Sequence, residues 1–311
     1  MAELDEADDT EVRSGSVAQT GRVRRAARGA SYWRSREGML VLPALGFYLL
    51  VYLYPLVQLA AWSIFDNGFT LRFYAELFQE PTYFKALSNT LEISVLVTGI
   101  CLILGYPLAH LIATTTPSAR RVLMILVLVP FWTSILVRTF AWIVILGNNG
   151  LVNRALLAIG ATTHPIKLVF NMIGVQIGMV HVLLPFMVFP LYGVMSRIDP
   201  SLKRSARSLG ASPARAFLHV FLPLSLPGVM AGCILVFLLA IGFYVTPALL
   251  GGPGEITLAT MIDMMINALL NWGLAATLGV LLVSVVGVIF VAFSRLMGVS
   301  RIIGATGEAG R

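Results

Sequence analysis

The sequence predicts an all-α membrane protein with six transmembrane helices, and three observations support this fold class. Of the 311 residues, 58% are hydrophobic and only 12% are charged, whereas soluble domains carry about 25% charged residues. The mean hydropathy is +0.85. Six apolar runs reach the roughly 20 residues that a helix needs to cross the hydrocarbon core, and they lack the short alternating segments of a β-barrel. The runs are 39–65, 90–113, 122–146, 168–195, 228–250 and 274–297.

The distribution of basic residues predicts the orientation. Seventeen of the 22 Lys and Arg residues fall in the segments 1–38, 114–121, 196–227 and beyond 294, and four fall in the segments between them. Cytoplasmic loops are the ones enriched in Lys and Arg, so both termini are predicted to be cytoplasmic. The net charge of +7 therefore reflects a membrane surface, and we expect membrane lipid as a partner and no nucleic acid.

The same patterns divide the chain into four parts. Residues 1–37, an acidic block followed by an Arg-rich one, are predicted to be a disordered cytoplasmic tail. Residues 38–85 are predicted to hold the first transmembrane helix and an external segment, and 86–295 the main transmembrane domain with a cytoplasmic loop at 196–227. Residues 296–311 form a second cytoplasmic tail. Short helices are expected within 66–88 and 147–167, and a loop is expected at 251–273.

Several enzyme signatures are absent from the sequence. There is no Gly-Lys dipeptide, and hence no phosphate-binding loop of the Walker type. The four histidines are scattered and form no H-E-x-x-H metal motif, and no nucleophile-elbow serine is present. Cys101 and Cys233 both fall inside apolar runs, which favours buried thiols over a disulfide. We therefore expect no catalytic residues, no metal site and no cofactor on this chain.

The most informative stretch is RSARSLGASPARAFLHVFLPLSLPGV, residues 204–229. Asp199 followed by Pro200 is typical of a helix start, and Gly210 is a natural left-handed helix stop. Ser212 followed by Pro213 starts a second helix in the same way, which we expect to run to Leu222 and Pro223 before Pro227 opens the next span. The segment thus predicts a compact helix–turn–helix, where a plain basic loop would need only its charges.

This segment resembles a motif of the membrane subunits of binding-protein-dependent ABC importers of the type I fold. Their motif has Glu-Ala-Ala, three residues, Gly, nine residues, Ile, one residue and Leu-Pro. Here Arg204, Ser205 and Ala206 precede Gly210 at that spacing, and Val220, Leu222 and Pro223 complete it. Arg204 stands where the family has Glu, so the local charge is reversed.

The resemblance implies a six-helix permease subunit in a bacterial inner membrane. It implies two ATPase subunits that bind ATP and Mg, a second permease subunit, which we expect to be a different homologous chain, and an extracytoplasmic solute-binding protein. It also implies that the 196–227 loop docks on the ATPase. The residues it assigns to this coupling are Arg204, Ser205, Ala206, Leu209, Gly210, Ala211, Ser212, Pro213 and Arg215.

Three further stretches are similar to the spermidine/putrescine-type branch of this family. They are NTLEIS at 89–94, PFWTSILVRTFAWIVILGNNGLVN at 130–153 and IGFYVTPALLGGP at 241–253. The resemblance implies import of a polyamine or of a related amine or amino-acid-like compound. Where that branch often has an acidic residue after Gly242, this chain has Phe243.

Arg138 is the sharpest single candidate for the translocation pathway. A charge within a span costs at least about 2.5–3.5 kcal/mol by insertion scales, so such residues are functional candidates by default. We expect its guanidinium to pair with Glu92 or with free carbonyls, and a role in bundle packing stays an alternative. Trp142, Tyr244 and Asp263 are further pathway candidates, and His181 is expected to be a packed, hydrogen-bonded histidine.

A stand-alone ion-coupled secondary transporter is the alternative function. That class predicts buried acidic or histidine relays and an inverted repeat. The acids of this chain lie mostly in its tails and loops.

Overall fold

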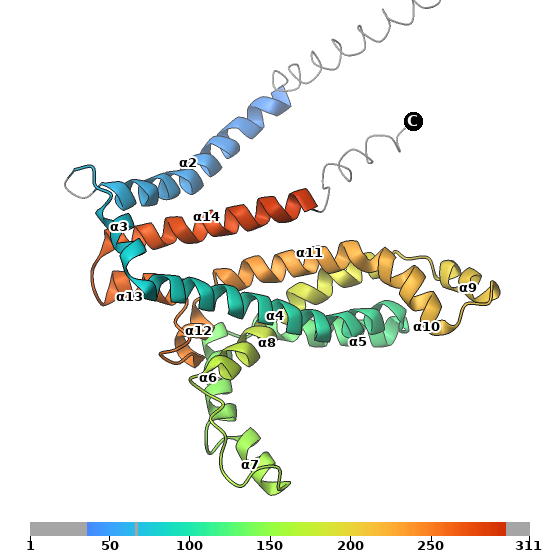
Figure 1. Ribbon diagram of the computed structural model, residues 1–311. Coiled ribbons are helices and arrows are strands. Elements are labelled where there is room, and N and C mark those ends of the chain that lie inside the picture. The colour runs from blue at the N-terminus through green and yellow to red at the C-terminus, as the bar shows by residue number, and fades with distance from the viewer. Residues whose placement is uncertain (1–35, 66–67, 297–311) are drawn as a thin grey trace, which may run out of the picture. The chain divides into compact units, whose positions relative to one another are not determined.

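A computed structural model describes residues 36–65 and 68–296, and these residues are helical except for turns, loops and one isolated β-bridge between Phe65 and Phe69. The predicted tails at 1–37 and 296–311 lie almost wholly outside the described residues. In chain order (Figure 1) the helices are α2 (Arg36–Ile64), α3 (Arg72–Gln79), α4 (Pro81–Thr114), α5 (Pro117–Leu128), η1 (Val129–Trp132), α6 (Ile135–Leu146), α7 (Leu151–Ala158), α8 (Met172–Met195), α9 (Pro200–Ser208), α10 (Pro213–Ala216), η2 (Phe217–Phe221), α11 (Leu222–Ile241), α12 (Val245–Leu250), α13 (Leu258–Asn267) and α14 (Trp272–Leu296).

The chain divides into two compact units, residues 1–61 and residues 62–311. The first unit contains most of α2, whose apolar side chains, such as Phe47 and Leu50, are exposed. An apolar helix of this length with no buried face is suited to lipid. The second unit holds all the other helices and both hydrophobic cores.

Among the described residues, six helical segments are long and apolar enough to cross a membrane, which confirms the predicted number. They are Val41–Ile64, Pro81–Thr114, Ile135–Ala158, Met172–Met195, Pro213–Ile241 and Trp272–Arg295. The short helices expected in 66–88 and 147–167 are also present, as α3 and α7.

The prediction of one continuous helix at 122–146 is wrong. The chain forms α5, a 3-10 turn over Val129–Trp132, and then α6, with Thr133 and Ser134 in extended conformations between them. Pro130 has no N–H to donate and favours such a break. Because every residue near the break except Thr133 and Ser134 is apolar, hydropathy alone did not reveal it.

The predicted bounds of the fifth span, 228–250, are also wrong. The helix that begins at Pro213 continues through a π-helical turn, η2, into α11 and ends at Ile241, so Pro227 lies inside the helix. The segment 242–244 then interrupts the helix before α12 begins. The 251–273 segment contains the helix α13, which was not predicted and which starts with a Thr257–Thr260 capping box.

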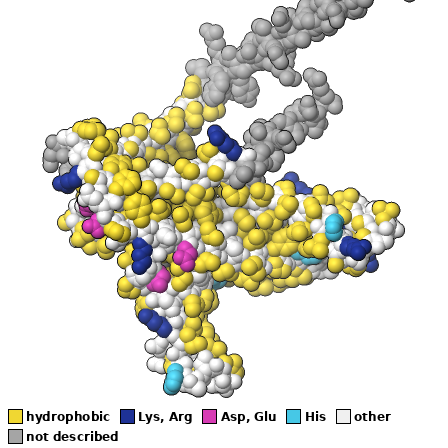
Figure 2. Space-filling model, viewed as in Figure 1, with side chains coloured by type: hydrophobic (Ala, Val, Ile, Leu, Met, Phe, Trp, Pro, Cys, Tyr) yellow, Lys and Arg dark blue, Asp and Glu magenta, His cyan; other side chains and the backbone are white. Residues whose placement is uncertain are grey.

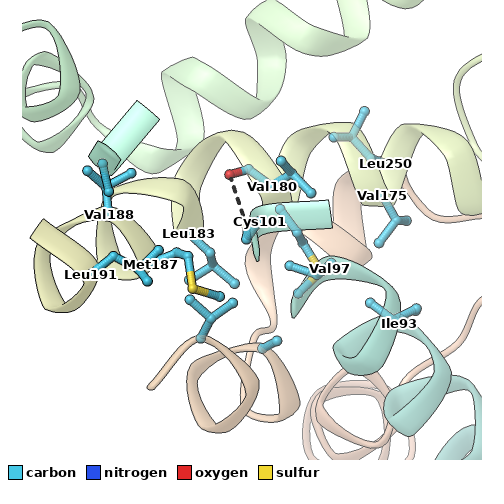
Figure 3. Packing of buried hydrophobic residues seen from close by; sticks show 14 of the residues in the cluster. Ile93, Val97, Cys101, Val175, Val180, Leu183, Met187, Val188, Leu191 and Leu250 are labelled. Atoms are coloured by element: carbon cyan, nitrogen blue, oxygen red, sulfur yellow. Dashed lines mark hydrogen bonds between the residues drawn. The ribbon is translucent and has the colours of Figure 1, made fainter. Parts of the chain in front are cut away.

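The main core lies where α4, α8 and α11 pack together (Figure 3). Met187 of α8 is fully buried between two glycines. A β-carbon at Gly105 of α4 would lie 2.9 Å from its Cγ, and one at Gly232 of α11 would lie 2.7 Å from its Sδ. Small residues let membrane helices approach closely, because van der Waals packing is what holds such helices together.

A second, smaller core joins α3, α13 and α14 with the first turns of α4. Phe73 is 2% exposed, and its ring covers Gly273 at the start of α14. Thr90 of α4 accepts a hydrogen bond from the backbone N–H of Leu258, at 2.9 Å, which fixes the start of α13 against α4. The described surface is mostly apolar with few charged groups (Figure 2), as lipid-facing helices require.

Candidate coupling loop and translocation cavity

The first candidate site is the segment 199–213, which we call the coupling loop. The Asp199 carboxylate accepts a hydrogen bond from the backbone N–H of Ser201, at 2.8 Å, and Pro200 follows as the first helical residue of α9. Hydrogen bonds from the Ser201 backbone and side chain lower the pKa of Asp199, and the charge of Arg204 adds to this effect. This is the helix start that the sequence predicted.

Gly210 ends α9 as predicted, with φ at +88°. The N–H of Gly210 bonds to the carbonyl of Arg207, and the N–H of Ala211 bonds to the carbonyl of Ala206, both at 3.0 Å. These two bonds define a Schellman motif, in which a left-handed residue satisfies the last helical carbonyls. Ser212 then accepts from the N–H of Arg215, at 3.3 Å, and starts α10.

The coupling loop presents its side chains outward. Leu209 is 88% exposed, the largest exposed fraction among the large apolar side chains of the described residues. Arg204, Ser205, Gly210, Ser212, Pro213 and Arg215 are exposed too, while Ala206 and Ala211 are half-buried.

Three side chains that no sequence motif marks, Lys203, His110 and Phe221, hold α9 against the membrane helices. The Lys203 Nζ lies 3.7 Å from the centre of the Phe221 ring and 3.5 Å from Nε2 of His110 in α4. The His110 ring in turn packs edge-on against Phe221, with centroids 4.9 Å apart. Burial lowers the pKa of the Lys203 ammonium. Lys203 is adjacent to Arg204 and was passed over as one more loop charge.

The second candidate site surrounds Arg138. Its guanidinium donates to the carbonyl of Pro130 and, at 2.9 Å, to the carbonyl of Thr133. Its Nε lies 3.2 Å from the Thr133 Oγ1. The break between η1 and α6 leaves the Thr133 carbonyl without a helical partner, and Arg138 satisfies it. The Pro130 carbonyl also accepts hydrogen bonds from the N–H and the hydroxyl of Thr133. Glu92, the acidic partner considered from the sequence, is exposed on α4 and forms no ion pair with Arg138.

Arg138 also borders a cavity of about 270 Å³, which we call the Arg138 cavity. Its walls come from η1, α6, α8 and α11 and are mostly apolar, with Phe131, Leu183, Phe186 and Phe243 among them. The rings of Phe131 and Phe186 lie 5.1 Å apart. A cavity with apolar walls and a few polar groups at one edge is the usual form of a small-molecule site.

The other predicted pathway residues form two pairs. Trp142 of α6 donates from Nε1 to Nδ1 of His181 in α8, at 3.0 Å, which confirms that His181 is hydrogen-bonded. Tyr244 donates to the Asp263 carboxylate, and this bond raises the pKa of the Tyr244 phenol. Asp263 also accepts from Asn267, at 2.6 Å. Within the described residues, no three acidic, histidine or cysteine side chains are grouped as a metal site would need.

The remaining polar anchors are two asparagines, Asn153 and the half-buried Asn89, that carry no sequence motif for this role. Asn153 is fully buried and makes three hydrogen bonds, to the carbonyls of Gly147 and Ile166 and from the N–H of Ile166. Asn89 donates to the carbonyls of Gly254 and Ile256. Both side chains fix loops at the end of the bundle remote from α9 (Figure 1).

A bundle of apolar, proline-interrupted helices with a rigid helix–turn–helix beyond the ends of its spans defines a membrane transport subunit. The chain matches the family model described as "Binding-protein-dependent transport system inner membrane component" over residues 102–298, and it belongs to this family. It is an inner-membrane permease subunit of an ABC importer. Family membership thus decides against the stand-alone transporter.

Curated relatives give the same result. The chain is 36% identical to the spermidine/putrescine transport system permease protein PotB of Escherichia coli (strain K12) over 227 residues, covering 73% of this chain and 82% of that protein. It is 39% identical to the PotB of Haemophilus influenzae over 212 residues, covering 68% of this chain and 74% of that protein.

A solved bacterial ABC transporter involved in the import of the acidic polysaccharide alginate has a similar fold. The TM-score is 0.71 at 20% identity, and the match covers 88% of this chain and 98% of that one. A structure of the alginate transporter with a pentasaccharide-bound periplasmic protein gives 0.70 at the same identity. At this identity the likeness concerns the fold.

Proposed function

We propose that this chain forms one half of a translocation pathway that ATP hydrolysis on other chains drives. The complex would contain two ATPase subunits that bind ATP and Mg, a second and different permease chain, and an extracytoplasmic solute-binding protein. The observation that carries the proposal is the coupling loop, because its two helices, two caps and left-handed Gly210 hold the exposed Leu209 in one place. A preorganised, apolar projection reduces the entropic cost of docking.

The orientation that follows places the coupling loop and both termini on the cytoplasmic side. Arg120 and Arg121 lie in the first turns of α5, and Arg197, Lys203, Arg204, Arg207 and Arg215 lie in or beside the coupling loop. This concentration of basic residues supports the assignment. The Asn89 and Asn153 anchors then belong to the outer side, where a binding protein would dock.

Movement of the ATPases would reach the pathway through the contacts of α9. When the ATPases close on ATP, the coupling loop moves with them. Helix α9 transmits this movement to α4 through the contact of Lys203 with His110, and to η2 through the contact of Lys203 with Phe221. The π-helical turn η2 is a point at which the helix can change its winding, since π-bulges are local distortions found often at functional sites. The spans then switch the cavity from the cytoplasmic to the outer side.

We propose that the solute is a polyamine such as spermidine or putrescine, or a related amine or amino-acid-like compound. The names of the relatives support a polyamine. The Arg138 cavity supplies apolar and aromatic walls for a methylene chain, and the Arg138 guanidinium at its edge suits a zwitterionic, amino-acid-like solute better than a polycation. We also propose Trp142, Tyr244 and Asp263 as pathway residues. Among them, Asp263 supplies a carboxylate, which accepts a hydrogen bond from the Tyr244 hydroxyl.

Co-purification tests the proposal. With the full importer expressed from its own components, we expect Leu209→Asp to remove most of the bound ATPase and to abolish solute uptake. Ile159→Asp is the matched control, because Ile159 is 76% exposed but lies at the opposite end of the spans, after α7. Equal ATPase recovery with Leu209→Asp and wild type would contradict docking at the coupling loop.

A further inference from the structure

A second cavity lies between the coupling loop and the ends of the membrane helices. It encloses about 490 Å³ and is bordered by the last turns of α4 and α8, by Arg120 of α5, and by Pro200, Lys203 and Phe221. We call it the Lys203 pocket. It shares no lining residue with the Arg138 cavity, and Asp199, Pro200 and Lys203 of the coupling loop form one of its walls.

The two cations of this pocket have no acidic partner within the described residues. Arg120 donates from Nε to the carbonyl of Ile112, at 3.2 Å, and from Nη2 to the carbonyls of Ala113 and Thr115. Lys203 contacts the Phe221 ring and the His110 nitrogen. Neither contact supplies a negative charge. Asp199 also lines the pocket, and its carboxylate is exposed, accepts a hydrogen bond from the Ser201 N–H and forms no ion pair with Lys203 or Arg120.

Partial burial makes this lack of an anion costly. Lys203 and Arg120 are both half-buried, and removing a charge from water without a counter-ion is unfavourable. Burial lowers the pKa of Lys203 for the same reason, because it disfavours the charged ammonium. An anion in the pocket would offset it and would also contact the N-terminal end of α9, where helix dipoles favour negative charge.

The position of the pocket selects the kind of anion. Thr114 and Met195, which border it, are the last residues of two membrane spans, so the pocket lies at the depth of the lipid headgroups. Basic pockets between membrane helices on the cytoplasmic side bind anionic headgroups. We propose that the Lys203 pocket binds the phosphate of an anionic phospholipid and that the lipid thereby holds α9 against α4 and α8.

The test uses the purified importer in nanodiscs of phosphatidylcholine that contain a minor fraction of photoactivatable phosphatidylglycerol. We expect Lys203→Gln to lower labelling of the chain about fivefold, as loss of one membrane-proximal basic charge predicts. Lys203→Arg should retain labelling. Arg204→Gln is the matched control, because Arg204 is the next residue on α9 but is exposed.

A second arm adds inorganic phosphate as competitor. Labelling that resists millimolar phosphate supports the lipid as source, whereas loss of labelling shows that free phosphate occupies the same phosphate site. Equal labelling of wild type, Lys203→Gln and Arg120→Gln would overturn the proposal.

Discussion

Gly210→Ala tests the coupling loop at its most constrained residue. Gly210 has φ at +88°, and a β-carbon there would meet no atom within 4 Å. The cost of Ala is therefore conformational and not steric, about 1–2 kcal/mol for a left-handed backbone. That free energy corresponds to a factor of about 5–30 in population. Because only the correctly turned loop can dock, the apparent affinity for the ATPase should fall by the same factor.

The assay is titration of purified ATPase subunits against the chain in nanodiscs, read as bound ATPase and as ATP hydrolysis stimulated by the binding protein. Gly210→Asn is the matched control, since Asn tolerates the left-handed region better than Ala. We expect affinity in the order Gly, Asn, Ala. Wild-type affinity for Gly210→Ala would refute the conformational argument. Equal losses for Ala and Asn would show that a side chain at this position collides with the ATPase instead.

Three further predictions concern the core, the outer loop and the Arg138 cavity. Met187→Ala leaves a void between Gly105 and Gly232. We expect the free energy of unfolding to fall by about 2 kcal/mol, the low end for a buried methionine, as measured by thermal unfolding in detergent. An unchanged unfolding midpoint would show that the helices close the gap. Asn153→Ala removes three hydrogen bonds of about 1 kcal/mol each. The Ile166 N–H should therefore exchange with deuterium far faster than in wild type. Unaltered exchange would contradict the anchoring role of Asn153. Arg138→Met removes the side-chain donor of the Thr133 carbonyl and one of the donors of the Pro130 carbonyl. We expect uptake to fall about tenfold, a loss of about 1.4 kcal/mol, with normal ATPase co-purification and with partial recovery in Arg138→Lys. Full uptake by Arg138→Met would exclude a pathway role.

The coupling loop could be predicted from the sequence because its signals are local. Asp199, Gly210 and Ser212 each act within three residues on their own backbone, and Pro is favoured at the first position of a helix. The structure reproduces both caps and the left-handed turn. The number of spans was predictable for the related reason that hydrocarbon thickness sets helix length.

The breaks in the third and fifth spans could not be predicted, because hydropathy does not distinguish an apolar helix from an apolar turn. Thr133 and Ser134 interrupt one span, and residues 242–244 end another, yet both stretches are surrounded by apolar residues. The hydrogen-bond partners of Arg138 could not be predicted either, because they depend on the break between η1 and α6. The Thr133 carbonyl is available to Arg138 only because η1 ends at Trp132, so Glu92 was an equal candidate until the backbone was known.

The Lys203 pocket could not be predicted from the sequence, because tertiary contacts form it. His110 is 93 residues from Lys203 in the sequence, and the two side chains meet only because α9 lies beside the end of α4. Lys203 stands beside Arg204 in a basic segment, where nothing in the residue order separates a half-buried ammonium from an exposed guanidinium. Burial, rather than charge, distinguishes the two residues.

Site-specific photo-crosslinking from position 209 tests most directly that the coupling loop docks on an ATPase. A photoreactive residue replaces Leu209 in the complete importer, and a second variant carries it at the equally exposed Ile159. The account predicts a crosslink from position 209 to the ATPase subunit, and none from position 159. An ATPase crosslink from position 159 without one from position 209 would contradict both the docking site and the orientation of the chain.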